Sequence, residues 1–528
     1  MNNIPTRNLL LVLAALSLCC LIENAESANI LALLPSSSPS HVIFEISVAR
    51  QMAMRHHNVT IISVLPLKED WLHPSMKHIK LDKGLLDMTM AVNSTQYSGL
   101  ARVKSFMEMY KTMIVGQGDI LDDPKMKELI YNTGNNFDLI LWGYFAGDYF
   151  FGLAEHFDCP VALLWPNIPI IAISNLMGNP LEMSYTVTTM MNMAADTTGF
   201  GFRLKNVLAN AVESVLTRLR DKWSKPIYEK YFPSDKYVSY EKAKERVSLV
   251  LFSHHFSEKP VRPLVPGMIE IGGIHLDEET KPLPKDIEEF VSAAEHGVIF
   301  FSLGTNVKAK HLQPQTLEKV FNVLSKLPQR VLWKCDDESN VPGNSTNILY
   351  RKWLPQADIL GHPKTVLFFC HGGKGGITEA KFYGVPMVGL PIFGDQPMNM
   401  EEVVMKGYGL SIEHDESLSE EVIRKTVKEV LENTSYRNNV RQFSNLYRDR
   451  PLKIKDNAVY WLEYVIRYKG APHMQSPLKT MSFVEANNLD AYACILLVFY
   501  IIALLVKLIL KLIINLVCRK CMGKSKRD

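Results

Sequence analysis

Residues 366–397 read VLFFCHGGKGGITEAKFYGVPMVGLPIFGDQP, and their pattern indicates the fold class. Two short apolar runs, Val366–Phe369 and Pro386–Leu390, are separated by a glycine-rich turn and a helix-forming segment. A buried strand, a helix and a second buried strand form the repeating unit of a parallel sheet that is covered by helices. The stretch therefore predicts an α/β fold.

The same order of elements occurs twice earlier in the chain. Near the N-terminus, the strand Asn29–Leu34 leads through a Ser/Pro-rich loop to the helical pattern Val42–Met54 and the strand Asn58–Val64. In the second half, the apolar strands Val298–Leu303 and Arg330–Trp333 flank another helical stripe. The sequence therefore predicts two α/β halves with parallel sheets.

The segment 276–286 is the expected linker, because it is charged, contains two prolines and has no periodicity. Ligands of such proteins gather at the carboxyl ends of the strands, so the chemistry is expected in the cleft between the halves. The predicted parts are a signal peptide (1–27), a first half (28–275), the linker (276–286), a second half (287–488), a membrane helix (489–517) and a basic tail (518–528).

Both termini are hydrophobic, for different reasons. At the N-terminus Arg7 precedes the apolar run Leu9–Ile22, and the small residues Ala25 and Ser27 suit cleavage of a signal peptide. Near the C-terminus, residues 489–517 are long enough for one membrane helix, and five basic residues follow them. Basic residues just beyond an apolar span mark the cytosolic side, which predicts a type I protein with a luminal or extracellular body.

Composition excludes several classes of protein. A formal charge of +3 over 528 residues and a hydrophobic content of 47% exclude a disordered or nucleic-acid-coating chain. The body's cysteines, Cys159, Cys335 and Cys370, are too few and scattered for a disulfide framework or a zinc site. Patterns of triphosphate loops, dehydrogenases, zinc proteases and serine hydrolases are absent from the sequence. Four glycosylation sequons fit a luminal chain: Asn58, Asn93, Asn344 and Asn433.

Several features of the second half suit a nucleoside diphosphate sugar. The turn His371-Gly372-Gly373 between a strand and a helix exposes backbone N–H groups and a positive helix end, which suit a diphosphate. Glu379 on that helix can accept hydrogen bonds from ribose hydroxyls, and Trp353 can stack on a base. Asp395-Gln396 at a strand end can hold sugar hydroxyls. Taken singly, each feature also has a purely structural explanation.

Together these motifs resemble the signature of the UDP-glycosyltransferase family, and the resemblance covers nearly the whole chain. Its blocks are Phe301–Thr305, Trp353–Gln356, His371–Gly373, Thr378-Glu379 and Gly394–Gln396. The resemblance implies a GT-B fold of two Rossmann-like domains, with a UDP-sugar co-substrate in the second, a lipophilic acceptor in the first, and no cofactor or metal. The implied contacts are Trp353 and Gln356 with uracil, Glu379 with ribose, His371, Gly373, Thr305 and Arg262 with the phosphates, and Asp395 and Gln396 with the sugar.

The resemblance also makes His41 the catalytic base for the acceptor hydroxyl. His41 stands at a helix start, whose positive end disfavours imidazolium and keeps the ring neutral. Many family members carry an acid that orients this histidine, and Gly143 occupies that position. Asp148 is a candidate substitute, although a loop or cap role explains it equally well. If the acid is missing, Gly143→Asp is expected to raise the rate.

Two functions follow from these features. The first is an active transferase of the endoplasmic reticulum membrane that conjugates small lipophilic molecules, as in detoxification. The second is a donor-binding, weakly catalytic or regulatory homologue, which Gly143 favours. Glucose is preferred to glucuronate because the first half resembles members outside the vertebrate branch. Lys524 and Lys526 resemble a dilysine retrieval signal, and Met177–Met193 lies where acceptor loops are expected. The bilayer is an expected partner, nucleic acid is not, and homo- and hetero-oligomers both remain open.

Overall fold

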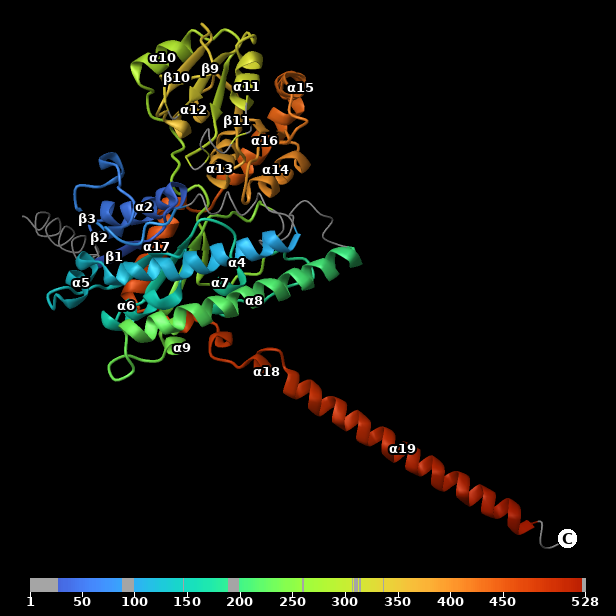
Figure 1. Cartoon of the computed structure of the whole chain (residues 1–528). Coiled ribbons are helices and arrows are strands. Elements are labelled where there is room, and N and C mark those ends of the chain that lie inside the picture. The colour runs from blue at the N-terminus through green and yellow to red at the C-terminus, as the bar shows by residue number, and fades with distance from the viewer. Residues whose placement is uncertain are drawn as a thin grey trace, which may run out of the picture.

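The computed structural model describes residues 27–87, 99–145, 147–188, 199–258, 261–305, 307, 312, 315–335 and 337–524. Two parallel sheets, one in each half of the chain, lie one above the other (Figure 1). The strand pairs in both sheets are parallel. The predicted α/β fold with two parallel sheets is confirmed. The predicted signal peptide and Asn93 lie outside the described residues.

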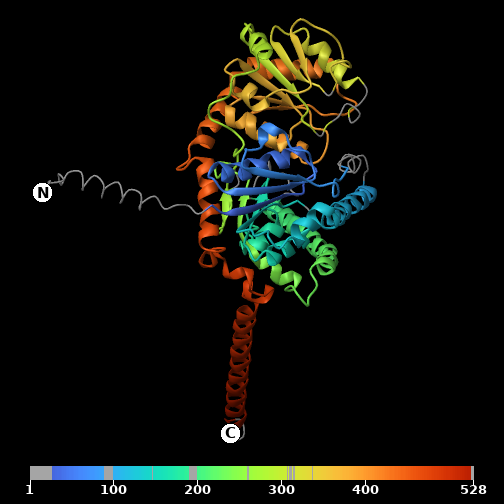
Figure 2. The same cartoon turned by 90° about the vertical axis from the view of Figure 1, so that its left-hand side faces the viewer.

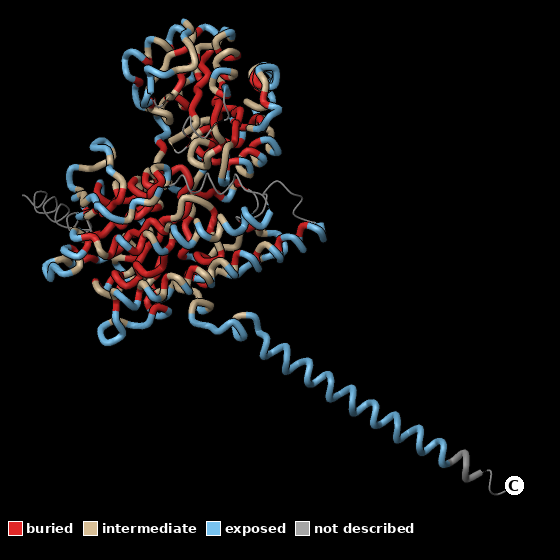
Figure 3. The backbone as a smooth tube through the Cα atoms, in the orientation of Figure 1, coloured by how far each residue is buried: buried red, intermediate tan, exposed pale blue. Residues whose placement is uncertain are grey.

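The first sheet has seven strands, with β4 at its centre beside β1, the first strand of the body. Its order is β3 (Met76–Lys80), β2 (Asn58–Ser63), β1 (Asn29–Leu34), β4 (Leu139–Gly143), β5 (Val161–Trp165), β6 (Val247–Phe252) and β7 (Met268–Glu270). Its helices are α2 (Pro39–Met54), α4 (Gly99–Gly116), α5 (Pro124–Tyr131), α6 (Phe151–His156), α7 (Ile171–Met177), α8 (Phe200–Tyr231) and α9 (Tyr240–Ala243). Separate apolar cores on the two faces of the sheet bury its strands (Figure 3).

The second sheet has six strands, with β8 and β11 at its centre. Its order is β10 (Ile348–Arg351), β9 (Arg330–Lys334), β8 (Val298–Ser302), β11 (Thr365–Cys370), β12 (Met387–Gly389) and β13 (Gly409–Ser411). Its helices are α10 (Lys285–Ser292), α11 (Thr316–Leu324), α12 (Gln356–Gly361), α13 (Lys374–Tyr383), α14 (Gln396–Met405), α15 (Glu420–Glu432) and α16 (Thr434–Arg448). Residues 271–284, which contain most of the expected linker, form neither helix nor strand.

Helix α17 (Ile454–Arg467) follows the second half in sequence and lies on the first half in space. It packs against α2 and β6, and its residues Ala458 and Leu462 join the core that buries β1. Figure 2 shows this segment running along the first sheet toward the C-terminal helix. The bounds 287–488 predicted for the second half therefore differ from its extent in space, because α17 falls within them and packs on the first half. An apolar helix face predicts that the helix packs on a sheet but does not identify which sheet.

Helix α19 (Leu489–Lys524) projects from the body. Its apolar part, Leu489–Arg519, has 31 residues, none of them buried in the body, and at 1.5 Å per residue it is about 46 Å long, enough to cross a bilayer. The predicted C-terminal membrane helix is confirmed as an apolar helix of spanning length. Just before it, Lys479 Nζ donates to the Val247 carbonyl at 2.6 Å, so the segment that leads to α19 is attached to the first half.

Candidate active site

The His-Gly-Gly turn lies between β11 and α13, as the sequence predicts. β11 ends at Cys370, Gly372 has a φ of 78°, and Gly373 is the N-cap of α13. The free N–H groups in the first turn of α13 and its positive end therefore point toward the turn. This arrangement suits an anion such as a diphosphate.

His371 is enclosed by two glycines. A Cβ on Gly373 would lie 2.4 Å from His371 Nε2, and one on Gly304 would lie 2.5 Å from Cε1, so neither position accepts a side chain without a shift. Burial, helped by the charge of Lys334, lowers the pKa of His371 to about 4, so the ring is neutral at pH 7. Thr305 is the next residue of the loop that carries Gly304. The structure thus brings these three predicted phosphate residues to one place.

Replacing Gly373 by alanine is expected to weaken UDP binding by roughly tenfold or more. The added Cβ would push His371 and the turn apart, and overpacking of this kind costs about 1–3 kcal/mol, where 1.4 kcal/mol is tenfold in affinity. Titration calorimetry with UDP measures the change. Gly201→Ala is the matched control, because Gly201 lies on α8 in the first half and a Cβ there meets no atom within 4 Å. Equal affinities of the two variants would contradict the prediction.

The residues predicted to contact uracil and ribose also come together. Gln356 Nε2 donates to Glu379 Oε2, which joins the first turn of α12 to α13. On the other side, His275 Nε2 lies 3.3 Å from Glu379 Oε1. Sequence reasoning missed His275 because it belongs to the connection between the halves, for which no contact could be assigned.

Trp353 marks a contact between the halves. Its side chain is half exposed, and Lys68 Nζ from the loop after β2 lies 2.9 Å from the centroid of the indole. A cation on the face of an indole is an attractive contact. The loops at the carboxyl ends of both sheets thus face each other, and one face of the predicted base platform contacts the first half.

At the predicted sugar end, Asp395 and Gln396 differ in their surroundings. Asp395 is exposed, and its Oδ2 accepts a hydrogen bond from Asn399 Nδ2 at 2.8 Å. Asn399 also donates to the Gly372 carbonyl at 3.0 Å, which ties this loop to the His-Gly-Gly turn. Gln396 is buried, and its Oε1 accepts from the backbone N–H groups of Ile392 and Phe393. Its side-chain oxygen therefore braces the loop.

His41 is the third residue of α2, directly after the loop that follows β1. Its ring meets Phe145 edge to face, with 5.2 Å between the centroids. Burial lowers the pKa of His41 to about 4, and its Nδ1 is buried with no hydrogen-bond partner among the described residues. The ring is therefore neutral at pH 7, as expected for a base at a helix start.

Asp148 is occupied by other partners. Its carboxylate is 2.9 Å from Arg220 Nε and 3.3 Å from Lys244 Nζ, and it accepts a hydrogen bond from the Tyr144 hydroxyl at 2.8 Å. Burial would raise its pKa, but the two cations outweigh burial and lower it. These contacts hold α8 against the sheet, and they leave the expected support of His41 by Asp148 without a structural basis.

Arg262 lies on the wall of a pocket in the first half. Its Nη2 donates to the Val187 carbonyl at 2.6 Å, and burial lowers its pKa to about 10 despite the nearby carboxylate of Glu213. The pocket is lined by residues of 179–188, by α7 and by α8. The described part of the predicted acceptor segment thus forms a pocket, and Arg262 belongs to it.

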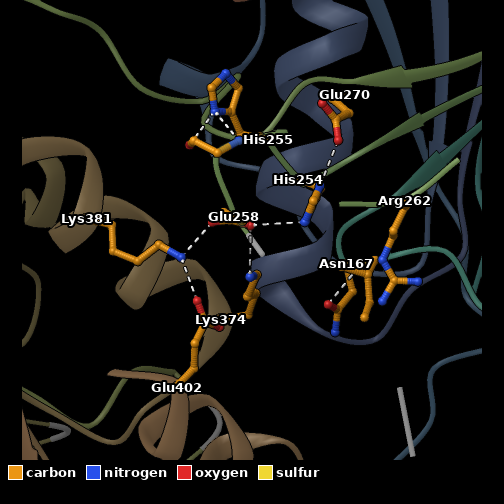
Figure 4. Close-up of polar contacts among 12 residues, drawn as sticks. Asn167, His254, His255, Glu258, Arg262, Glu270, Lys374, Lys381 and Glu402 are labelled. Atoms are coloured by element: carbon orange, nitrogen blue, oxygen red, sulfur yellow. Dashed lines mark hydrogen bonds and ion pairs between the residues drawn. The ribbon is translucent and has the colours of Figure 1, made fainter. Parts of the chain in front are cut away.

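A buried ion network joins the halves beside the His-Gly-Gly turn (Figure 4). Glu258, in the loop after β6, lies 2.6 Å from Lys381 Nζ and 3.6 Å from Lys374 Nζ, and both lysines belong to α13. Lys381 also pairs with Glu402 at 3.3 Å, and His254 Nε2 is 3.8 Å from Glu258. Burial would raise the pKa of Glu258, but the two lysines outweigh it and lower the pKa.

Three of the predicted glycosylation sequons can be placed. Asn58, Asn344 and Asn433 are all exposed, and Asn433 also caps α16. Within the described ranges, no group of three or more His, Cys, Asp or Glu side chains is arranged to hold a metal ion.

Comparisons with known proteins agree with this geometry. The family model described as "UDP-glucoronosyl and UDP-glucosyl transferase" matches residues 40–528. The chain is 32% identical over 519 residues to "UDP-glycosyltransferase UGT5" of Dactylopius coccus, covering 97% of both chains. It is 32% identical over 481 residues to "UDP-glucuronosyltransferase 2B1" of Rattus norvegicus, covering 87% of this chain and 88% of that one.

A solved structure shows the same fold. The UDP-glucosyltransferase from Polygonum tinctorium superposes with a TM-score of 0.56 at 14% identity, over 84% of this chain and 99% of that one. Its likeness, with that of other solved glycosyltransferases, establishes the GT-B fold of this chain. With a family match over nearly its whole length, the chain belongs to the UDP-glucuronosyl and UDP-glucosyl transferase family.

Proposed function

We propose that this family member transfers glucose from UDP-glucose to a hydroxyl of a small lipophilic acceptor, with inversion and with His41 as the base. The observation that carries the proposal is the neutral, half-buried imidazole at the start of α2, with a pKa lowered to about 4 by burial. A neutral imidazole at pH 7 can accept the proton that the attacking hydroxyl must lose.

The reaction is a single in-line displacement. The acceptor hydroxyl gives its proton to His41 while its oxygen forms a bond to the anomeric carbon of the sugar. The bond from that carbon to the diphosphate breaks, and its electron pair leaves with UDP. The turn at 371–373 and the positive end of α13 are suited to stabilise the negative charge of the leaving group. Glu379, Gln356 and Trp353 are proposed to hold the uridine.

The proposed location is the membrane of the endoplasmic reticulum, with the body in the lumen. The apolar part of α19 supplies a membrane anchor of sufficient length. The basic residues after it favour a cytosolic tail. The sequons on the body favour a luminal body.

The test is UDP release by the full-length, detergent-solubilised protein with UDP-glucose and UDP-glucuronate over a panel of phenolic acceptors. We expect turnover with UDP-glucose to exceed turnover with UDP-glucuronate for the same acceptor. Turnover with glucuronate alone would overturn the choice of sugar, and absence of turnover with both would overturn the transferase proposal.

Gly143 supports a second candidate, a donor-binding homologue with weak catalysis. The strand end that carries the orienting acid in many relatives has no carboxylate at this residue. UDP-sugar binding without turnover would support this candidate.

A further inference from the structure

Gly143 ends β4 beside α2, and the space above it is filled. A Cβ on Gly143 would lie 2.3 Å from Cδ of Glu45, 2.4 Å from its Oε1 and 2.5 Å from its Oε2. The three closest atoms to that position are therefore the three atoms of one carboxyl group. The position that the Cβ of an acidic residue at 143 would take is therefore occupied by the carboxyl group of Glu45, which belongs to α2.

Glu45 has no hydrogen bond among the described residues that explains its burial. Its side chain is 1% exposed, and neither carboxyl oxygen has a hydrogen-bond partner among the described residues. Burial raises its pKa to about 8. An unpaired buried carboxyl destabilises a fold, so its presence on an otherwise apolar helix face calls for another explanation.

The position of Glu45 relative to His41 supplies that explanation. The two residues are four apart on α2, so their side chains lie on the same face one turn from each other. His41 Nδ1 is also buried without a partner among the described residues. Hydrogen bonds of catalytic groups are often long before substrate binds and shorten in the complex. Two buried, unsatisfied groups one turn apart can satisfy each other through a small change of rotamer.

Resting on the proposed role of His41 as base, we propose that Glu45 is its positioning residue and replaces the carboxylate absent at Gly143. Glu45 accepts a hydrogen bond from Nδ1–H of His41, which leaves Nε2 to take the acceptor's proton. This hydrogen bond favours the ionised form of Glu45, whose pKa burial raises to about 8 while the carboxyl has no partner, so Glu45 releases its proton to solvent on pairing. The carboxylate then stabilises the imidazolium and takes up no proton from it. In this chain the supporting acid is on α2 and not at the end of β4, and its carboxyl lies above the end of that strand.

This assignment changes the outcome expected for Gly143→Asp. In the wild-type background the new side chain overlaps the carboxyl of Glu45, so the single variant is expected to be slower. The increase in rate that the sequence predicts for Gly143→Asp requires a smaller side chain at Glu45, as in Glu45→Ala.

The experiment compares four variants of the full-length protein: Glu45→Leu, Glu45→Ala, Gly143→Asp and the double variant Glu45→Ala/Gly143→Asp. Glu45→Leu keeps volume and removes the carboxyl, and we expect kcat to fall by about 100-fold or more while the KM for UDP-glucose is unchanged. The double variant is expected to regain at least about tenfold over Glu45→Ala, because an aspartate on the strand restores the acid.

The outcomes separate this inference from the transferase proposal. A Glu45→Leu variant as active as wild type would identify Glu45 as mere filling and overturn the inference, while loss of activity in His41→Ala would still support the base. A double variant that folds, as judged by its melting temperature, and is no faster than Glu45→Ala would also overturn it. A wild type without turnover would overturn both.

Discussion

Replacing His41 by alanine is expected to lower kcat for glucosyl transfer by about 10²- to 10⁴-fold, the usual contribution of a positioned general base. The methyl group of the variant cannot accept the hydroxyl proton. UDP release with an excess of acceptor measures kcat. The affinity for UDP should be unchanged, because the described contacts of His41 are with the first half.

The exposed histidine His296 provides the control, since His296→Ala should keep full activity. The pH profile gives an independent check. His41 acts only when deprotonated, and burial lowers its pKa to about 4, so activity should be lost only as the pH falls toward 4. Rates at pH 5.5 and 7.5 should agree within about twofold. A midpoint near the ordinary histidine pKa of 6.5 would contradict the role of a buried base.

The second large effect concerns the stability of the junction between the halves. Glu258→Ala leaves Lys374 and Lys381 without their shared carboxylate, and Lys381 is only 1% exposed. Removing one partner of a buried ion pair typically costs about 3–5 kcal/mol. In Glu258→Ala, Lys381 keeps only its 3.3 Å pairing with Glu402. Unfolding by urea, followed by tryptophan fluorescence, should show a clear fall of the midpoint.

Lys285→Ala is the matched control for that experiment. Lys285 pairs with Glu289 at 3.9 Å, but its side chain is 91% exposed, and surface pairs contribute about 0–1 kcal/mol. A loss of stability in Glu258→Ala no larger than in this control would show that the network is solvated in solution.

The strands were the most predictable part of the fold. Asn29–Leu34 agrees with β1 at both ends, and Val366–Phe369 lies within β11, because strands buried on both faces are continuous apolar runs. The destination of α17 could not be predicted, because its apolar face fits either sheet. The predicted phosphate residues His371, Gly373 and Thr305 come together because each follows a strand at the same edge of the second sheet. Arg262 does not join them and lies in the pocket of the first half.

The supporting acid was the main feature that sequence reasoning missed. The motif spacing predicts the acid at residue 143, which is a glycine, and the next acid in the sequence is Asp148. The carboxyl that fills the space above Gly143 belongs to Glu45 on α2. The available signal was Glu45 itself, a lone acid within the apolar pattern Val42–Met54. Its proximity to Gly143 depends on the packing of α2 against β4, which one sequence does not reveal.

The return of α17 has a consequence for motion. The chain passes from the first half to the second through residues 271–284 and comes back between α16 and α17, so the second half is held by two tethers. A body fixed at two points rotates only about the line that joins them. Because the return places α17 and the segment before α19 on the first half, the anchor fixes that half relative to the bilayer. Any change in the separation of the two halves must therefore be accommodated by both connections.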